Sequence, residues 1–174
     1  MSVRLSKAIR VADSAHAILL RVQAFDDSAL TKEEHWSLPR HNGIEPMLLA
    51  LSMELALKAW FMFDFDVAEV KKTHNLRKLF KALKPESQKR LAAGFQNTIA
   101  PDHFPKFVYG DLGIEDFLEH HADAFVDWRY LHEATQLHFN TGAFIATLEM
   151  VLREFRKRYR ETRITPTFGR RLAQ

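Results

Sequence analysis

The sequence contains no cysteine, and this absence excludes several classes of chemistry. Without a thiol in its 174 residues, the chain has no disulfide, thiolate zinc site, iron–sulfur cluster or cysteine nucleophile. Any reaction that it catalyses must therefore use histidine, carboxylate, arginine or hydroxyl groups.

Glycine and proline are also scarce. There are 6 residues of each type, whereas an all-β sandwich or barrel needs many of them between its short strands. Hydrophobic residues make up 47% of the chain and charged residues 27%, which is the composition of a folded protein rather than a disordered one. We therefore expect an all-α protein with one core.

The chain also lacks a long apolar run. No stretch approaches the roughly 18 apolar residues that indicate a membrane span. Residues 1–22 carry charges throughout, unlike the apolar centre of a signal peptide. The expectation is a cytoplasmic protein that has no membrane partner.

Motifs for nucleotide, metal and nucleophilic sites are missing as well. There is no GxGxxG turn, no P-loop and no GxSxG nucleophile turn. The histidines of the segment HEATQLH, His132 and His138, lie six positions apart, so a helix cannot bring them to one face as the i, i+4 spacing of HExxH does. We expect no metal and no cofactor, and a histidine–carboxylate metal bundle stays as an alternative.

The net charge of +3 conceals an uneven distribution. Residues 153–174 hold eight basic and two acidic side chains, a net charge of +6, and the other residues sum to −3. Clustered Lys and Arg side chains attract phosphates, because they displace counterions from nucleic acid. A solvated helix end has the same pattern, since cations interact favourably with the helix dipole there, and both interpretations stay open.

Hydrophobic periodicity and helix-breaking residues divide the chain into five to six helices. Thr73 is the expected N-cap of the third helix, Pro85 lies in the first turn of the fourth, and residues 100–113 form an irregular loop. The fold class is thus an all-α, up-and-down helical bundle in a single domain, residues 1–161, followed by a basic C-terminal tail, residues 162–174. The expected helical segments are about 5–26, 44–63, 73–83, 85–99, 114–138 and 142–161.

Two of these segments carry the clearest patterns. The segment 44–63 has only three charged residues, so it must lie in the centre of the bundle. In the segment 142–161 the apolar residues form one stripe, and four basic side chains turn to the outside. We predict that these four residues bind nucleic acid: Arg153, Arg156, Lys157 and Arg160.

The segment 114–138 carries the candidate catalytic pair. At about 100° per residue, its apolar side chains and His121 share one face, and Arg129 and His132 lie on or beside that face. An arginine in this position can hold a phosphate, and a histidine can move a proton.

The alternative for these charges is a structural network. A charge that faces the core needs a partner, because an unpaired buried ion is strongly destabilising. Glu54 and Lys58 lie one turn apart in the most apolar helix. We predict a buried polar network in which Glu54 pairs with Lys58 or with Arg129.

Three segments resemble the HEPN family (higher eukaryotes and prokaryotes nucleotide-binding). The apolar helix Leu49–Phe63 contains the family's Glu-x-x-x-Lys pattern as Glu54 and Lys58. Thr73–Leu83 is similar to its His-x-Leu-x-x-Leu helix, and Ala124–Ala134 stands where the family carries its Arg…His helix. The resemblance extends over roughly residues 1–160 in helix order.

This resemblance implies an all-α bundle that forms a homodimer. Catalytic members are metal-independent ribonucleases of toxin–antitoxin and phage-defence systems, so the implied partners are RNA or a nucleotide, a second copy of the chain, and the partner protein of a toxin–antitoxin pair. Arg129 and His132 would be the catalytic residues. Only two residues separate them here, which is closer than in the family's pattern, and a non-catalytic dimerisation or protein-interaction module stays as the alternative function.

Overall fold

Helices make up the protein, as the sequence predicts. The computed structural model describes residues 3–27, 44–70, 72–104, 111–129 and 139–164, and no strand occurs in these ranges. The long helices are α1 (Val3–Asp27), α2 (Ile44–Phe65), α4 (Pro85–Thr98) and α9 (Thr141–Ile164). The short helices are α3 (Leu76–Lys81), α5 (Ala100–His103), α7 (Ile114–His120) and α8 (Ala124–Arg129).

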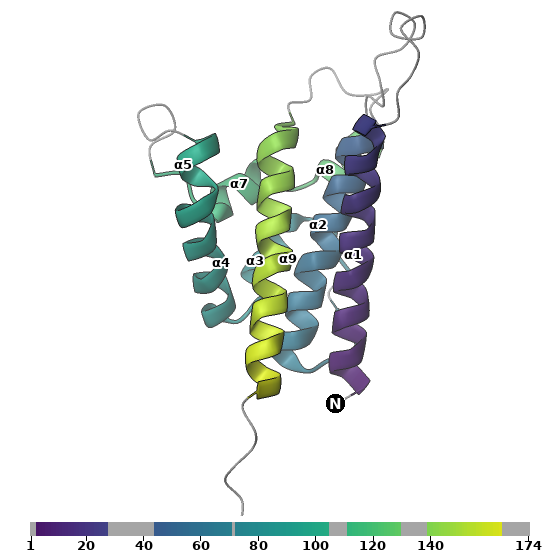
Figure 1. The fold of residues 1–174 in the computed structure, drawn as a ribbon, viewed down its shortest axis with the longest axis vertical. Coiled ribbons are helices and arrows are strands. Elements are labelled where there is room, and N and C mark those ends of the chain that lie inside the picture. The colour runs from purple at the N-terminus through teal and green to yellow at the C-terminus, as the bar shows by residue number, and fades with distance from the viewer. Residues whose placement is uncertain (1–2, 28–43, 71, 105–110, 130–138, 165–174) are drawn as a thin grey trace, which may run out of the picture.

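Helix α2 lies at the centre of the arrangement. It packs against α1, α3, α8 and α9, and α1 runs antiparallel to it (Figure 1). Helix α4 lies on the other side of α9 and runs antiparallel to it (Figure 1). By length and composition α2 could also cross a membrane, but most of that window is buried inside the protein. An apolar helix surrounded by others is the expected centre of a helical core.

The long helices bury the faces that the sequence predicts. On α1, Ala8, Ala15 and Leu19 are buried, whereas Arg10 and Arg21 are exposed. On α9 the buried stripe is Phe144, Leu148, Val151, Leu152 and Phe155. The predicted phase of α9 is therefore confirmed, and α1 likewise buries one apolar face. Helix α9 extends to Ile164, into the segment expected as a tail, and residues 165–174 lie outside the described part of the chain.

The predicted continuous helix over residues 114–138 is wrong. Helix α7 ends at His120 and α8 begins at Ala124. The carbonyl oxygen of Ala122 accepts a hydrogen bond of 2.9 Å from the backbone N–H of Leu76. That N–H lies in the first turn of α3, where backbone donors have no partner within their own helix. The break shifts the angular positions of the later side chains about the helix axis. A single helical-wheel projection therefore does not show which residues share a face across the break.

Two smaller expectations are also corrected. Asn75, not Thr73, caps α3, because the Asn75 side chain accepts the backbone N–H of Lys78 at 2.9 Å. The Thr73 hydroxyl instead accepts the N–H of Asn75. The loop expected at 100–113 begins with the helical turn α5, because Pro101 suits a first turn, where its missing N–H has no partner to lose.

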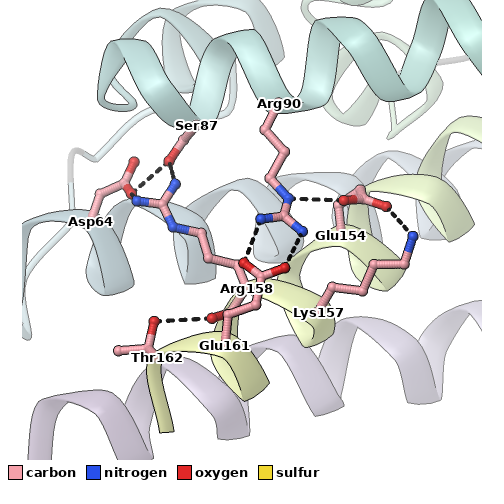
Figure 2. Close-up of polar contacts among 8 residues, drawn as sticks. All are labelled: Asp64, Ser87, Arg90, Glu154, Lys157, Arg158, Glu161 and Thr162. Atoms are coloured by element: carbon pink, nitrogen blue, oxygen red, sulfur yellow. Dashed lines mark hydrogen bonds and ion pairs between the residues drawn. The ribbon is translucent and has the colours of Figure 1, made fainter. Parts of the chain in front are cut away.

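A buried carboxylate connects three of the long helices. Asp64, near the end of α2, has a fully buried side chain, and Arg158 of α9 lies 3.3 Å from it. Ser87 of α4 donates to the same carboxylate at 2.6 Å, and the backbone N–H of Lys84 donates at 2.9 Å. Arg158 also donates to the Ser87 hydroxyl (Figure 2). The guanidinium of Arg158 lies over the ring of Trp60, 5.5 Å from its centroid.

A second set of ion pairs holds α4 against α9 nearer the surface. Arg90 of α4 donates to Glu154 at 2.9 Å and to Glu161 at 2.8 Å, both on α9 (Figure 2). The two helices also approach closely at Gly94, where an added Cβ would lie 2.8 Å from Sδ of Met150. The ion pairs of Arg90 and the lack of a side chain at Gly94 therefore fix the position of α4 on α9.

The buried carboxylate generates a stability prediction. Asp64→Ala is expected to lower the free energy of unfolding by about 3 kcal/mol, because it leaves Arg158 and the Lys84 N–H without their partner. Urea unfolding followed by circular dichroism measures the change. Glu161→Gln, which removes an exposed carboxylate from the neighbouring ion pairs, is the control and should change stability little. Equal losses in the two variants would contradict the role given to Asp64.

Candidate functional site

The four predicted nucleic-acid-binding residues line one hollow between α1 and α9. This hollow, which we call the basic groove, has a volume of about 420 Å³. Helix α1 contributes His16, Leu20 and Gln23, among others, and α9 contributes the basic residues and Glu149. All four basic side chains are exposed. The buried apolar stripe of α9 turns them outward, whereas Arg158 is turned inward toward Asp64. The groove lining from α9 is Glu149, Leu152, Arg153, Arg156, Lys157 and Arg160.

The groove has an excess of positive charge. Lys157 lies 2.7 Å from Glu154, and Glu149 accepts a hydrogen bond of 2.8 Å from Gln23 across the two helices. Within the described part of the chain, Arg153, Arg156 and Arg160 form no ion pair with a carboxylate. Four cations thus face one lining carboxylate in a concave surface, and such a surface concentrates anions.

His16 adds no full charge to the groove at neutral pH. Its pKa lies below the usual value of 6.5, because partial burial disfavours the charged ring and the guanidinium of Arg156 repels it. Asp13 and Glu149 oppose the shift. The pKa of His16 therefore reports the electrostatic potential in the groove, since a bound anion would favour the protonated imidazole.

The predicted catalytic pair is only partly within the described residues. Arg129 is the last residue of α8, a helix that packs against α2. His132 lies outside the described residues. The proposed pairing of these two residues around a phosphate therefore stays a prediction.

Glu54 and Lys58 form a polar cluster together with His74. The Glu54 side chain is 4% exposed, and its two oxygens lie 2.5 Å from Nζ of Lys58 and 2.9 Å from Nδ1 of His74. The His74 ring stacks on Phe125 of α8 at 5.0 Å. The i, i+4 spacing indicates Lys58 as a partner for Glu54, but nothing in the sequence brings His74 into contact, because that needs the path of the chain between α2 and α3.

A second hollow lies where α7 meets the residues before α9. Its volume is about 440 Å³, and its lining includes Phe104, Phe117, His121 and Phe139. We call it the aromatic cavity. It shares no lining residue with the basic groove. The sequence pattern predicts a core-facing His121, but it does not predict the cavity, since Phe104 and Phe139 are distant in sequence.

The pKa of His121 lies far below its usual value because the ring is buried. Its side chain is 4% exposed, and desolvation, assisted by repulsion from His120, lowers its pKa from 6.5 to about 4. His121 is therefore neutral at physiological pH. In the ranges that the structure describes, no group of three His, Asp or Glu side chains is arranged to hold a metal ion.

Comparisons with protein-family models, with curated proteins and with solved structures found no match for this chain. Function must therefore be argued from the geometry and charge of the described residues.

The shifted pKa of His121 generates a pH prediction. The unfolded chain takes up a proton near pH 6.5 and the folded chain only near pH 4, so acidification below about 6.5 favours unfolding. From about pH 7 to about pH 5 this group is expected to cost about 2 kcal/mol of stability. His121→Phe should lose correspondingly less stability over that range, measured by urea unfolding at each pH.

The exposed neighbour supplies the control. His120→Gln should keep most of the acid sensitivity of the unaltered protein, since desolvation, the larger cause of the lowered pKa of His121, is unchanged. If His121→Phe and His120→Gln lose stability in parallel with the unaltered protein, the neutral buried state of His121 is contradicted.

Proposed function

We propose that this protein is a HEPN-like helical domain that binds RNA, and that the basic groove holds the RNA backbone. The observation that carries the proposal is the convergence of Arg153, Arg156, Lys157 and Arg160 on one concave surface. Three of these have no carboxylate partner in the described residues, so their charge is available to an anion. Phosphate contacts of this kind supply most of the affinity of sequence-independent binding.

The shape of the groove favours an extended single strand. From Arg153 to Arg160 the axis of α9 rises by about 10 Å, which is long enough for a few consecutive phosphates. The described lining contains Leu20, which is 52% exposed, but no Phe, Tyr or Trp ring. Base stacking on aromatic rings is the usual source of base contacts in single-strand binding, so we expect weak sequence preference and strong salt dependence.

The groove proposal predicts a specific loss of RNA affinity. Replacing Arg153, Arg156 and Arg160 together by Gln is expected to weaken binding of a labelled oligouridylate of about 12 nucleotides by at least about tenfold, because phosphate contacts are lost. The unaltered protein should show a slope of log affinity against log salt of about −2, as about three single-strand phosphate contacts give. Fluorescence anisotropy over a salt series measures both quantities.

A matched variant separates the groove from net charge. Lys72, Lys78 and Lys89 are exposed and lie outside the groove, so their combined replacement by Gln removes the same charge. That variant should keep the affinity and the salt slope nearly unchanged. Equal losses in the two triple variants, or no RNA binding by the unaltered protein, would overturn the proposal and leave the non-catalytic interaction module.

His16 reports whether the RNA occupies the groove itself. Saturating oligouridylate should raise the pKa of His16, measured by NMR titration, because phosphates oppose the repulsion from Arg156. An unchanged His16 pKa in the saturated complex would show that RNA binds elsewhere.

The ribonuclease activity implied by the family resemblance is tested separately. If Arg129 and His132 cleave RNA, His132 takes the proton of the 2′-hydroxyl, whose oxygen bonds to the adjacent phosphorus, while Arg129 stabilises charge on the phosphate. The bond from phosphorus to the 5′-oxygen breaks, and the leaving 5′-oxygen takes a proton from water. Cleavage of labelled structured and unstructured RNAs is then expected to resist chelator and to fall below detection in Arg129→Ala and His132→Ala. Both variants should retain their circular dichroism spectra and RNA affinity. Cleavage that persists in both would contradict their catalytic role.

A further inference from the structure

The aromatic cavity is separate from the surface proposed to bind RNA. Its described lining comes from the end of α5, from α7 and from the residues that precede α9. Figure 1 shows α7 and α1 on opposite sides of α9. Its volume, about 440 Å³, falls within the range of pockets that hold small molecules, roughly 300–1,000 Å³.

Aromatic rings form the walls of this cavity. Phe117 lies 5.8 Å from Phe104 and 4.9 Å from His121, measured between ring centroids. The centroid of the Phe139 ring lies 5.0 Å from that of His121. These are the separations of aromatic rings in contact with one another, so the rings form one packed aromatic wall.

His121 is the polar group inside these walls. Its imidazole nitrogens form no hydrogen bond with any residue in the described ranges, yet no fully buried side-chain nitrogen or oxygen there lacks a partner. These two observations agree only if the imidazole nitrogens of His121 that lack a partner keep some accessible surface. Since the side chain is 4% exposed and lines the cavity, that access is into the cavity.

The other polar lining groups have partners or lie at the rim. Asp116 is exposed and accepts the backbone N–H of Gly113 at 3.0 Å. The side chain of Asn140 accepts the N–H of Ala143 at 3.0 Å, and His120 is exposed. The described interior is therefore lined by aromatic rings and by one imidazole that has no hydrogen-bond partner among the described residues.

We infer that the aromatic cavity binds a small, uncharged, planar heteroaromatic molecule, whose ring packs against Phe104, Phe117 and Phe139 and whose edge hydrogen-bonds to His121. A neutral imidazole carries one N–H donor and one acceptor nitrogen, so it can bond to a ring N–H or to a ring nitrogen. A charged ligand is disfavoured deep in the cavity, because the carboxylate of the described lining, Asp116, is exposed at the rim and an unpaired buried charge is costly.

Indole and naphthalene are the probes that test the inference. They have similar planar shapes, but only indole carries an N–H. Titration calorimetry on the full chain is expected to give saturable binding of indole, at least about tenfold tighter than that of naphthalene, which corresponds to one hydrogen bond of about 1.4 kcal/mol. His121→Phe keeps a ring and removes the nitrogens, so it should reduce indole affinity to that of naphthalene and leave naphthalene binding intact.

Two further variants complete the test. Leu112→Trp adds bulk at the cavity lining without altering His121 and should abolish binding of both probes, whether or not His121→Phe folds. Phe65→Ala removes an exposed ring at the end of α2 that is not part of this lining, and the variant should bind both probes normally. Absence of saturable indole binding, or indole affinity that survives Leu112→Trp or a folded His121→Phe, would overturn the inference. RNA binding by the basic groove is independent of every outcome.

Discussion

The buried carboxylate of Asp64 is the constraint on which the arrangement of the long helices depends. A carboxylate with no exposed surface must be surrounded by donors, and it obtains them from α4 and α9. Arg158 points inward to meet that requirement, which favours the same rotation of α9 about its axis as its buried apolar stripe does. The side chains on the opposite face of the same helical turns therefore point outward. The buried ion pair and the apolar stripe of α9 thus agree on which basic residues of the C-terminal helix are exposed to an anion.

The long helices were predictable from the sequence because their apolar periodicity is local information. The burial of Leu148 and Phe155 and the exposure of Arg153 and Arg156 follow from spacing alone. The sequence did not reveal that Arg158, within the same basic run, is a structural residue. That distinction depends on Asp64, which is more than ninety positions away in the chain. The opposite wall of the groove, with His16 and Gln23, was missed for the same reason.

The break between α7 and α8 could not be predicted because its cause is tertiary. The hydrophobic pattern of residues 114–138 predicts one amphipathic helix. In the structure the carbonyl oxygen of Ala122 instead accepts a hydrogen bond from the first turn of α3. The hydrophobic pattern correctly predicted burial of Ile114, Phe117 and His121 before the break. Periodicity measures burial, and it does not indicate whether a buried histidine packs in a filled core or borders an open cavity. Glu54 illustrates the same limit, since only one of its two partners shares its helix.

The short turn at 121–123 has a further consequence for motion. His121 borders the aromatic cavity, Ala122 accepts the N–H of Leu76, and Asp123 accepts from the side chain of Asn75. These three consecutive residues connect the cavity to the start of α3 and, through the adjacent His74, to Glu54. If the turn opened, the contacts of these three residues would be released together, so we expect this end of the molecule to unfold locally as one cooperative unit. Anything that fills the cavity would slow hydrogen exchange at the Leu76 amide, although no ligand atom would touch it.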